Sequence, residues 1–193
     1  HPIIGVAWKY KERAEYDGSV SGGQVALRYT APGSDLRNDM MIIMFSSSTE
    51  RQDRWDFSID RSRPLGFRMI CHLDLAMGSG ELRLASTDPK VQPLLDYRYL
   101  EEESDRRRLR DSVRLCVKLA EHETFRPLLG ERIQPTDADL MSDDALDDWL
   151  RREVGTGHHV SCTCKMGSPS DPMAVVDQFG KVYGTEGLRV ADA

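Results

Sequence analysis

The feature that most constrains the fold is a strict alternation of side chains over residues 66–75 (GFRMICHLDL). Apolar side chains recur there at every second position: Phe67, Met69, Cys71, Leu73 and Leu75. A period of two is typical of a β-strand that buries one face. His72 falls on the opposite, more polar face, where we expect a solvated histidine. Residues 78–80 (GSG) then turn the chain into residues 81–85 (ELRLA), which also alternate, so the two segments are predicted to pair as an antiparallel hairpin.

Three earlier segments also predict strands. Residues 3–8 (IIGVAW) and 39–45 (DMMIIMF) are short, continuous apolar runs, as in buried strands. Residues 24–30 (QVALRYT) alternate only in part and fit either a strand or a short helix. The polar stretches 9–23 and 46–64 between these segments are predicted to be loops.

Two helices are predicted in the second half of the chain. Ser104 or Asp105 is the expected cap of a helix that runs to about Glu121, and Ser142 or Asp143 begins the second helix. Because strands come first and helices follow, the predicted fold class is α+β with a mainly antiparallel sheet. Apolar stripes at helical spacing comprise Leu109, Val113, Cys116, Val117 and Ala120 in the first helix and Leu146, Trp149, Leu150 and Val154 in the second.

Charge and composition exclude several functional classes. The formal net charge is −6, and the arginines at 106–108 follow glutamates at 101–103, so nucleic acid is not an expected partner. We expect these arginines to be solvated on the first turns of the helix. No apolar run approaches the ~20 residues of a membrane span, and no signal peptide is expected. Four cysteines in an acidic chain do not indicate a disulfide framework, so a reducing cytoplasm is predicted.

Residues 157–193 (GHHVSCTCKMGSPSDPMAVVDQFGKVYGTEGLRVADA) hold the densest chemistry in the chain. His158, His159, Cys162 and Cys164 are all metal-ligand types, but a single residue between two cysteines hinders both thiolates from reaching tetrahedral positions. A metal site is therefore the minor alternative, and a redox pair of the two cysteines is weaker still. The other interpretation is acid–base chemistry, because a histidine titrates near neutrality and can accept a proton from a substrate hydroxyl.

The same segment resembles the C-terminal signature of the glucose–methanol–choline (GMC) family of flavoenzymes, in its choline-dehydrogenase-like form. The family pattern His-x-x-(Gly/Ala/Cys)-Thr-Cys-x-Met-Gly appears as residues 159–167 (HVSCTCKMG). The pattern Asp-Pro-x-Ala-Val-Val-Asp appears as residues 171–177, and residues 182–193 (VYGTEGLRVADA) resemble the closing Val-x-Gly-x-x-Gly-Leu-Arg-Val-x-Asp-(Ala/Gly). Upstream, residues 80–89 (GELRLASTDP) and 95–100 (LDYRYL) also resemble family stretches.

The resemblance implies the substrate-binding part of an FAD-dependent oxidoreductase, with an antiparallel sheet of about six strands backed by helices. It implies oxidation of the CH–OH group of a choline-like, sugar or aliphatic alcohol to an aldehyde or ketone, with hydride passing to the flavin. His159 would take the hydroxyl proton, and His158 would have a secondary role. Asp192 and Ala193 are candidate flavin contacts. Residues 1–154 are predicted to form the substrate-binding domain, and residues 155–193 the active-site loop and a return into the FAD-binding domain.

The family pattern is not complete in these residues. There is no Gly-x-Gly-x-x-Gly strand–turn–helix, so the FAD-binding domain is an expected partner and this chain alone is expected neither to retain FAD nor to be active. Residues 76–80 (AMGSG) replace the family's Pro-x-Ser-Arg-Gly, so no role is carried over for that arginine. A second active-site residue is expected beyond Ala193. Two other hypotheses stay open: a non-catalytic binding module, and a metal-binding domain that uses the His and Cys cluster.

Overall fold

The computed structural model describes residues 1–11, 23–48 and 65–191, and the chain divides into two compact units. The first unit comprises His1–Glu81 and Tyr97–Gly157, and the second comprises Leu82–Asp96 and His158–Ala193. Most of the two predicted loops, 9–23 and 46–64, lies outside the described residues.

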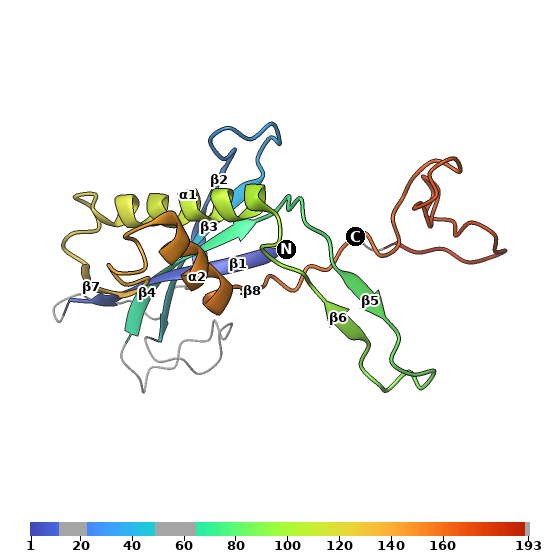
Figure 1. Cartoon of the computed structure of the whole chain (residues 1–193), viewed down its shortest axis with the longest axis horizontal. Helices are drawn as coiled ribbons and strands as arrows, with labels where there is room; N and C mark the ends of the chain where they lie inside the picture. Colours follow the sequence, from blue (N-terminus) through green and yellow to red (C-terminus); the bar gives the residue numbers. More distant parts are fainter. Residues whose placement is uncertain (12–22, 49–64, 192–193) are drawn as a thin grey trace. The chain divides into compact units, whose positions relative to one another are not determined.

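A six-stranded antiparallel sheet forms the centre of the first unit (Figure 1). Its strands are β1 (Pro2–Tyr10), β2 (Gly23–Tyr29), β3 (Met40–Ser48), β4 (Leu65–Leu73), β7 (Leu129–Gln134) and β8 (Gly155–Thr156). They lie in the order β2-β3-β4-β1-β7, and β8 pairs with the first residues of β1. The predicted sheet is confirmed, and residues 24–29 of the ambiguous segment 24–30 belong to strand β2. Both predicted loops begin too early, because β1 and β3 extend into them.

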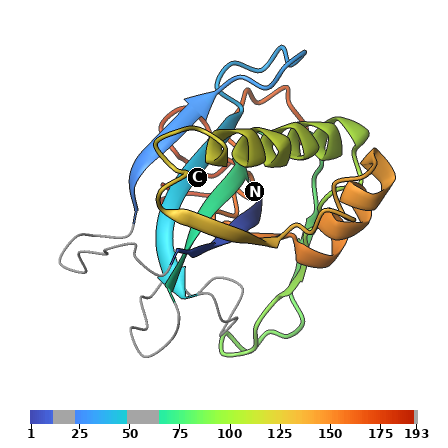
Figure 2. The ribbon, with the colours of Figure 1, turned by 90° about the vertical axis from the view of Figure 1, so that its left-hand side faces the viewer.

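Helices α1 (Glu103–Ala120) and α2 (Asp143–Glu153) supply the rest of the core. Figure 2 shows α1 crossing the sheet. The core side chains are at most 5% exposed: Ile4, Val6 and Trp8 of β1, Met69, Cys71 and Leu73 of β4, Leu109, Val113 and Cys116 of α1, and Leu146, Trp149 and Leu150 of α2. These residues confirm the predicted strand face and both helical stripes. Neither helix in the described part of the chain has the length and apolar character needed to cross a bilayer.

The two helix starts differ. Ser142 caps α2 as predicted, since its hydroxyl accepts a hydrogen bond from the backbone N–H of Ala145 at 3.1 Å. The prediction of Ser104 or Asp105 as the cap of α1 is wrong, because α1 begins at Glu103. Asp105 lies inside the helix, and its carboxylate accepts hydrogen bonds from the backbone of residues 77 and 78 instead.

The predicted hairpin of residues 66–75 with 81–85 is also wrong. β4 already pairs with β1 along one edge and with β3 along the other, so it has no edge left for a third strand. β5 (Glu81–Arg83) pairs with β6 (Leu94–Asp96) in a separate two-stranded sheet instead. β4 ends at Leu73, and the side chain of Leu75 is 42% exposed instead of continuing the buried face.

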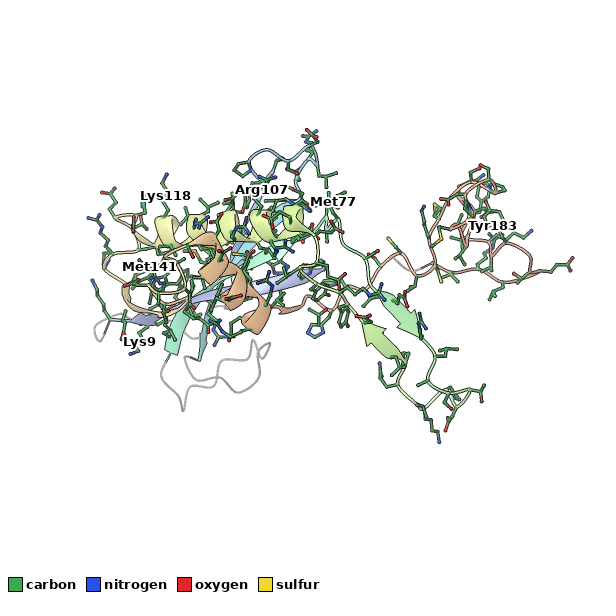
Figure 3. The ribbon with its side chains drawn as sticks, viewed as in Figure 1. Lys9, Met77, Arg107, Lys118, Met141 and Tyr183 are labelled. Carbon is green, nitrogen blue, oxygen red and sulfur yellow. The ribbon has the colours of Figure 1, made fainter. Side chains whose placement is uncertain are left out.

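Arg108 is buried at 2% exposure, which corrects the expectation of three solvated arginines. Its guanidinium contacts Asp39 Oδ2 at 2.8 Å and Asp105 Oδ1 at 2.6 Å. Asp39 also accepts hydrogen bonds from the Ala31 N–H and the Ser34 hydroxyl. A buried charge is tolerated only when it is paired and hydrogen-bonded, and here one arginine serves two carboxylates. Arg107, labelled in Figure 3, remains at the surface.

Candidate functional site

The two candidate histidines directly follow the last strand of the sheet. The backbone N–H of Gly157 donates to the carbonyl of His1 at 2.9 Å, and His158 begins the second unit. His158 has φ 61°, in the left-handed region that non-glycine residues rarely occupy. Such conformations cluster at functional sites, because the surrounding structure has to stabilise them. The side chains of His158 and His159 are both exposed, as a group that meets a substrate must be.

The Asp-Pro motif of the signature builds a turn. Asp171 accepts a hydrogen bond from the backbone N–H of Met173 at 2.9 Å, and its other oxygen lies 2.6 Å from Lys165 Nζ. Its own N–H donates to the carbonyl of Ser168 at 2.9 Å. The hydrogen bond from Lys165, followed by that from Met173, holds the pKa of Asp171 below its usual value. The carboxylate is therefore charged at neutral pH and acts as a scaffold for the turn.

Asp177 closes a second turn in the same way. Its Oδ1 accepts hydrogen bonds from the N–H groups of Lys181 at 2.9 Å and Phe179 at 2.8 Å, and the Lys181 N–H contributes most to lowering its pKa. Gly180 within this turn has φ 72°, and a Cβ atom there would lie 2.6 Å from the carbonyl oxygen of Val190. Only glycine allows this close approach, which brings the Leu-Arg-Val stretch alongside the turn.

Tyr183, labelled in Figure 3, connects the parts of the signature. Its hydroxyl donates to the carbonyl of Gly167 at 2.8 Å, and its N–H donates to the carbonyl of Val175 at 3.0 Å. Gly167 in turn donates its N–H to the carbonyl of Val176 at 3.0 Å. The Met-Gly, Asp-Pro and Val-Tyr-Gly stretches are thus one folded segment. Sequence reasoning predicted the histidines but missed the two aspartates as turn-formers, although an aspartate two residues before a required N–H is a known turn signal.

The His and Cys metal cluster, the minor alternative from the sequence, is not assembled among the described residues. Cys162 and Cys164 are free thiols, the first exposed and the second half-buried. Three metal-capable side chains do gather elsewhere, in the first unit: the ligand atoms of His1, His72 and Asp74 all lie within 4.8 Å of one another.

His72 is half-buried rather than solvated, which corrects the expectation from the sequence. Its Nδ1 lies 3.2 Å from Nε2 of His1, which is 71 residues away in the chain. The signal that was missed is the spacing of His72 and Asp74, because residues two apart on a strand share one face. The candidate flavin contacts Asp192 and Ala193 lie outside the described residues.

The described residues do not fit the diphosphate of FAD. A diphosphate is typically held at a helix N-terminus, where N–H groups and the helix dipole favour negative charge. The first turns of both helices in the described part of the chain carry carboxylates instead: Glu103 and Asp105 in α1, Asp143 and Asp144 in α2. These groups repel an anion.

Comparison with known proteins assigns the family. The family model of GMC oxidoreductase matches residues 77–193. An oxygen-dependent choline dehydrogenase of Photobacterium profundum is 37% identical over 128 residues, which cover 66% of this chain and 22% of that protein. A homologous enzyme of Chromohalobacter salexigens is 40% identical over 118 residues, which cover 61% of this chain and 21% of that protein. The match thus spans less than a quarter of the length of these relatives.

A solved structure confirms the fold over the whole chain. Formate oxidase superposes with a TM-score of 0.78 at 19% identity, over 100% of this chain and 41% of the other. The sequence match covers the histidine segment and the structural match covers the sheet and helices. The chain therefore belongs to the GMC oxidoreductase family.

Proposed function

We propose that this chain supplies the substrate-binding sheet and the active-site base of an FAD-dependent enzyme that oxidises the CH–OH group of an alcohol. The observation that carries the proposal is the family match, which includes His159, together with the exposed position of His159 beside a segment folded by its own hydrogen bonds. Choline is the first alcohol to test, because the relatives named above are choline dehydrogenases. The four free thiols support a reducing compartment, and we place the enzyme in the cytoplasm.

His159 acts on the hydroxyl group of the alcohol. Its imidazole accepts the hydroxyl proton, which raises the electron density on the carbon and lowers the barrier for loss of hydride from that carbon. Bound FAD would supply the acceptor for this hydride and its two electrons, which would leave the alcohol as an aldehyde or ketone; Asp192 and Ala193 are the residues of this chain proposed to contact it. His158 has a secondary role. Its left-handed backbone conformation orients the chain at the next residue, His159.

The FAD-binding domain is the proposed partner of the second unit. Ten large apolar side chains of this unit are at least 38% exposed: Leu82, Leu84, Val91, Leu94, Leu95, Val160, Met166, Met173, Phe179 and Leu188. Apolar surface of this extent is typical of an interface. We assign residues 1–154 to substrate binding and residues 155–193 to the active-site loop and its return into the flavin-binding domain, where Asp192 and Ala193 would contact the flavin.

The test is flavin reduction in the longer protein that joins this chain to its FAD-binding domain, mixed without oxygen with choline and a panel of other alcohols. We expect one alcohol to bleach the flavin absorbance, and His159→Ala to slow bleaching by about 10²–10⁴-fold, the usual contribution of a positioned base. The matched control is His122→Ala, since His122 is exposed on the loop after α1 and contacts Thr124.

The result separates the hypotheses. A His159→Ala protein that binds flavin normally and is reduced as fast as the unmodified protein contradicts the assignment of His159. A protein that carries no flavin under any condition contradicts the oxidoreductase proposal and favours a non-catalytic binding module.

A further inference from the structure

We propose that His1, His72 and Asp74 form a binding site for a divalent transition-metal ion of the Zn²⁺ type in the first unit. The proposed metal site uses neither His158 nor His159, the two histidines assigned to alcohol oxidation. It also differs from the His and Cys cluster that the sequence alone suggested.

Strand register places the three side chains on one face of the sheet. In the antiparallel pairing of β1 with β4, Ile3 lies opposite His72. His1 directly precedes β1 and Asp74 directly follows β4, so each lies two positions from that pair at the same end of the sheet. The buried apolar side chains of Ile4 and Leu73 point to the other face, into the core beneath the helices. The three polar groups therefore gather at the end of the sheet, away from the apolar core.

The distances match those of a metal centre. His1 Nε2 lies 3.2 Å from His72 Nδ1 and 3.7 Å from Asp74 Oδ1, and all three ligand atoms lie within 4.8 Å of one another. Ligands about 2.0–2.2 Å from a tetrahedral zinc ion are separated by about 3.3–3.6 Å. The separations of His1 Nε2 from His72 Nδ1 and from Asp74 Oδ1 are both close to this range. The two imidazole rings are tilted by 48° with centroids 5.4 Å apart, so they are not stacked and their nitrogens can converge on one point.

The surrounding backbone holds the ligands in place. Gly157 leaves room for the His1 ring, because a Cβ atom at this position would lie only 2.5 Å from His1 Nε2. The N–H of Gly157 donates to the His1 carbonyl, and the N–H of Asp74 donates to the Asp39 carbonyl at 2.9 Å. Asp39 is itself anchored by Arg108. Such supporting contacts orient ligands before the ion arrives.

The charge and exposure of the cluster also suit a dication. Two neutral imidazoles and one carboxylate have the donor set of zinc sites with three protein ligands, which keep a fourth position for water or substrate. The His1 and Asp74 side chains remain 16% and 15% exposed, so an ion can enter from solvent. The competing explanation is a simple N–H···N hydrogen bond between the two rings, and only a metal-binding experiment separates the two.

The experiment is calorimetric titration of the 193-residue chain with Zn²⁺ in a buffer that does not chelate metal. We expect one ion per chain. His72→Gln should abolish saturable binding, and Asp74→Asn should weaken it at least tenfold. Gly157→Ala keeps every ligand but displaces the His1 ring, and we expect it to weaken binding by about 10–100-fold, as for a lost supporting contact. Circular dichroism of each variant verifies that the fold is retained.

Three controls keep the assignment specific. Cys162→Ser/Cys164→Ser and His122→Gln should bind Zn²⁺ as tightly as the unmodified chain. Acetylation of the α-amino group should leave binding unchanged, because the proposed ligand is Nε2 of His1. No saturable binding by the unmodified chain overturns the proposal. Binding that survives His72→Gln, or is lost in the cysteine double variant or on acetylation, also overturns it.

Discussion

The two units of this chain are stabilised by different forces. The first unit buries apolar side chains from four strands and two helices, and seals a buried arginine between two carboxylates. Among the described residues of the second unit, Val176 is the one large apolar side chain that is buried, and order comes from turns closed by Asp171 and Asp177. The hydrophobic effect is thus the main stabilising term in one unit, and local hydrogen bonds in the other.

This difference explains why the signature is rich in Gly and places Asp at its turns. A short segment cannot bury enough apolar surface to offset the conformational entropy that it loses on folding. Side-chain caps and left-handed glycines reduce that cost at each turn, and they leave the apolar side chains available for a partner.

The largest effect is expected from Arg108→Ala in the first unit. The substitution leaves Asp39 and Asp105 buried without their counter-charge, which costs about 3–5 kcal/mol. Arg107→Ala is the matched control, since its guanidinium is 39% exposed and its loss should cost at most about 1 kcal/mol. Urea unfolding followed by the fluorescence of the buried Trp8 and Trp149 measures both. Equal losses would show that the buried network does not stabilise the first unit.

The second effect contrasts one leucine in each unit. Leu109→Ala removes a fully buried side chain of α1 and should lower the free energy of unfolding by about 2–5 kcal/mol. Leu188→Ala removes a side chain that is 50% exposed in the second unit, and should change it by no more than about 0.5 kcal/mol. The same urea experiment measures both. A large loss for Leu188→Ala would mean that the second unit has a core of its own.

The third effect is pH-dependent. Burial alone would raise the pKa of Asp39, but hydrogen bonds from Ser34, Ala31 and Arg108 together hold it below its usual 3.8. Because the folded pKa is lowered, the stabilisation is complete above about pH 4 and is lost as the pH falls through the folded pKa. Below pH 4, the free energy of unfolding of Asp39→Asn should therefore fall less steeply with pH than that of the unmodified chain. The two slopes should differ by up to about 1.4 kcal/mol per pH unit, the contribution of one proton. Urea unfolding at pH 6, 4 and 3 measures the slopes, and equal slopes would contradict the lowered pKa.

The fourth effect is local to the second unit. Asp177→Ala removes the acceptor of two backbone hydrogen bonds, so the amides of Phe179 and Lys181 should exchange with deuterium about tenfold faster or more. Amides of β4 should exchange as before. The matched control is Asp88→Ala, since Asp88 caps an equivalent turn at Lys90 elsewhere in the unit. Faster exchange in β4 would show that the two units are coupled.

The smallest effect concerns the exposed apolar surface. Phe179→Ser should leave the unfolding of the first unit within about 0.5 kcal/mol of the unmodified chain, since the side chain is 71% exposed. Because an uncovered apolar surface promotes association, we expect the isolated chain to self-associate and Phe179→Ser to reduce this, measured by sedimentation velocity. Met141→Ser, at an 82% exposed position of the first unit, should not reduce it. If Phe179→Ser and Met141→Ser change self-association equally, the proposal that the contact surface lies on the second unit is contradicted.

Local patterns in the sequence predicted the elements well, because periodicity and capping act over a few residues. The alternation as far as Leu73, the stripe of α1 and the Ser142 cap all appear in the structure. The candidate histidines come from a motif that lies within the residues matched by the family model, and their roles stay predictions. The partner of β5 could not be found this way, since it depends on which strand edges are already occupied.

The sequence by itself determined which residues alternate, which cap a helix and which histidines carry the family signature. Only the tertiary structure decided that Arg108 is buried, because its partner Asp39 lies 69 residues away in the chain. The same holds for His1 and His72, which meet across 71 residues through the register of β1 and β4. The physical reason is that a strand's face is set by its own two-residue repeat, whereas its neighbour is set by the packing of the whole sheet.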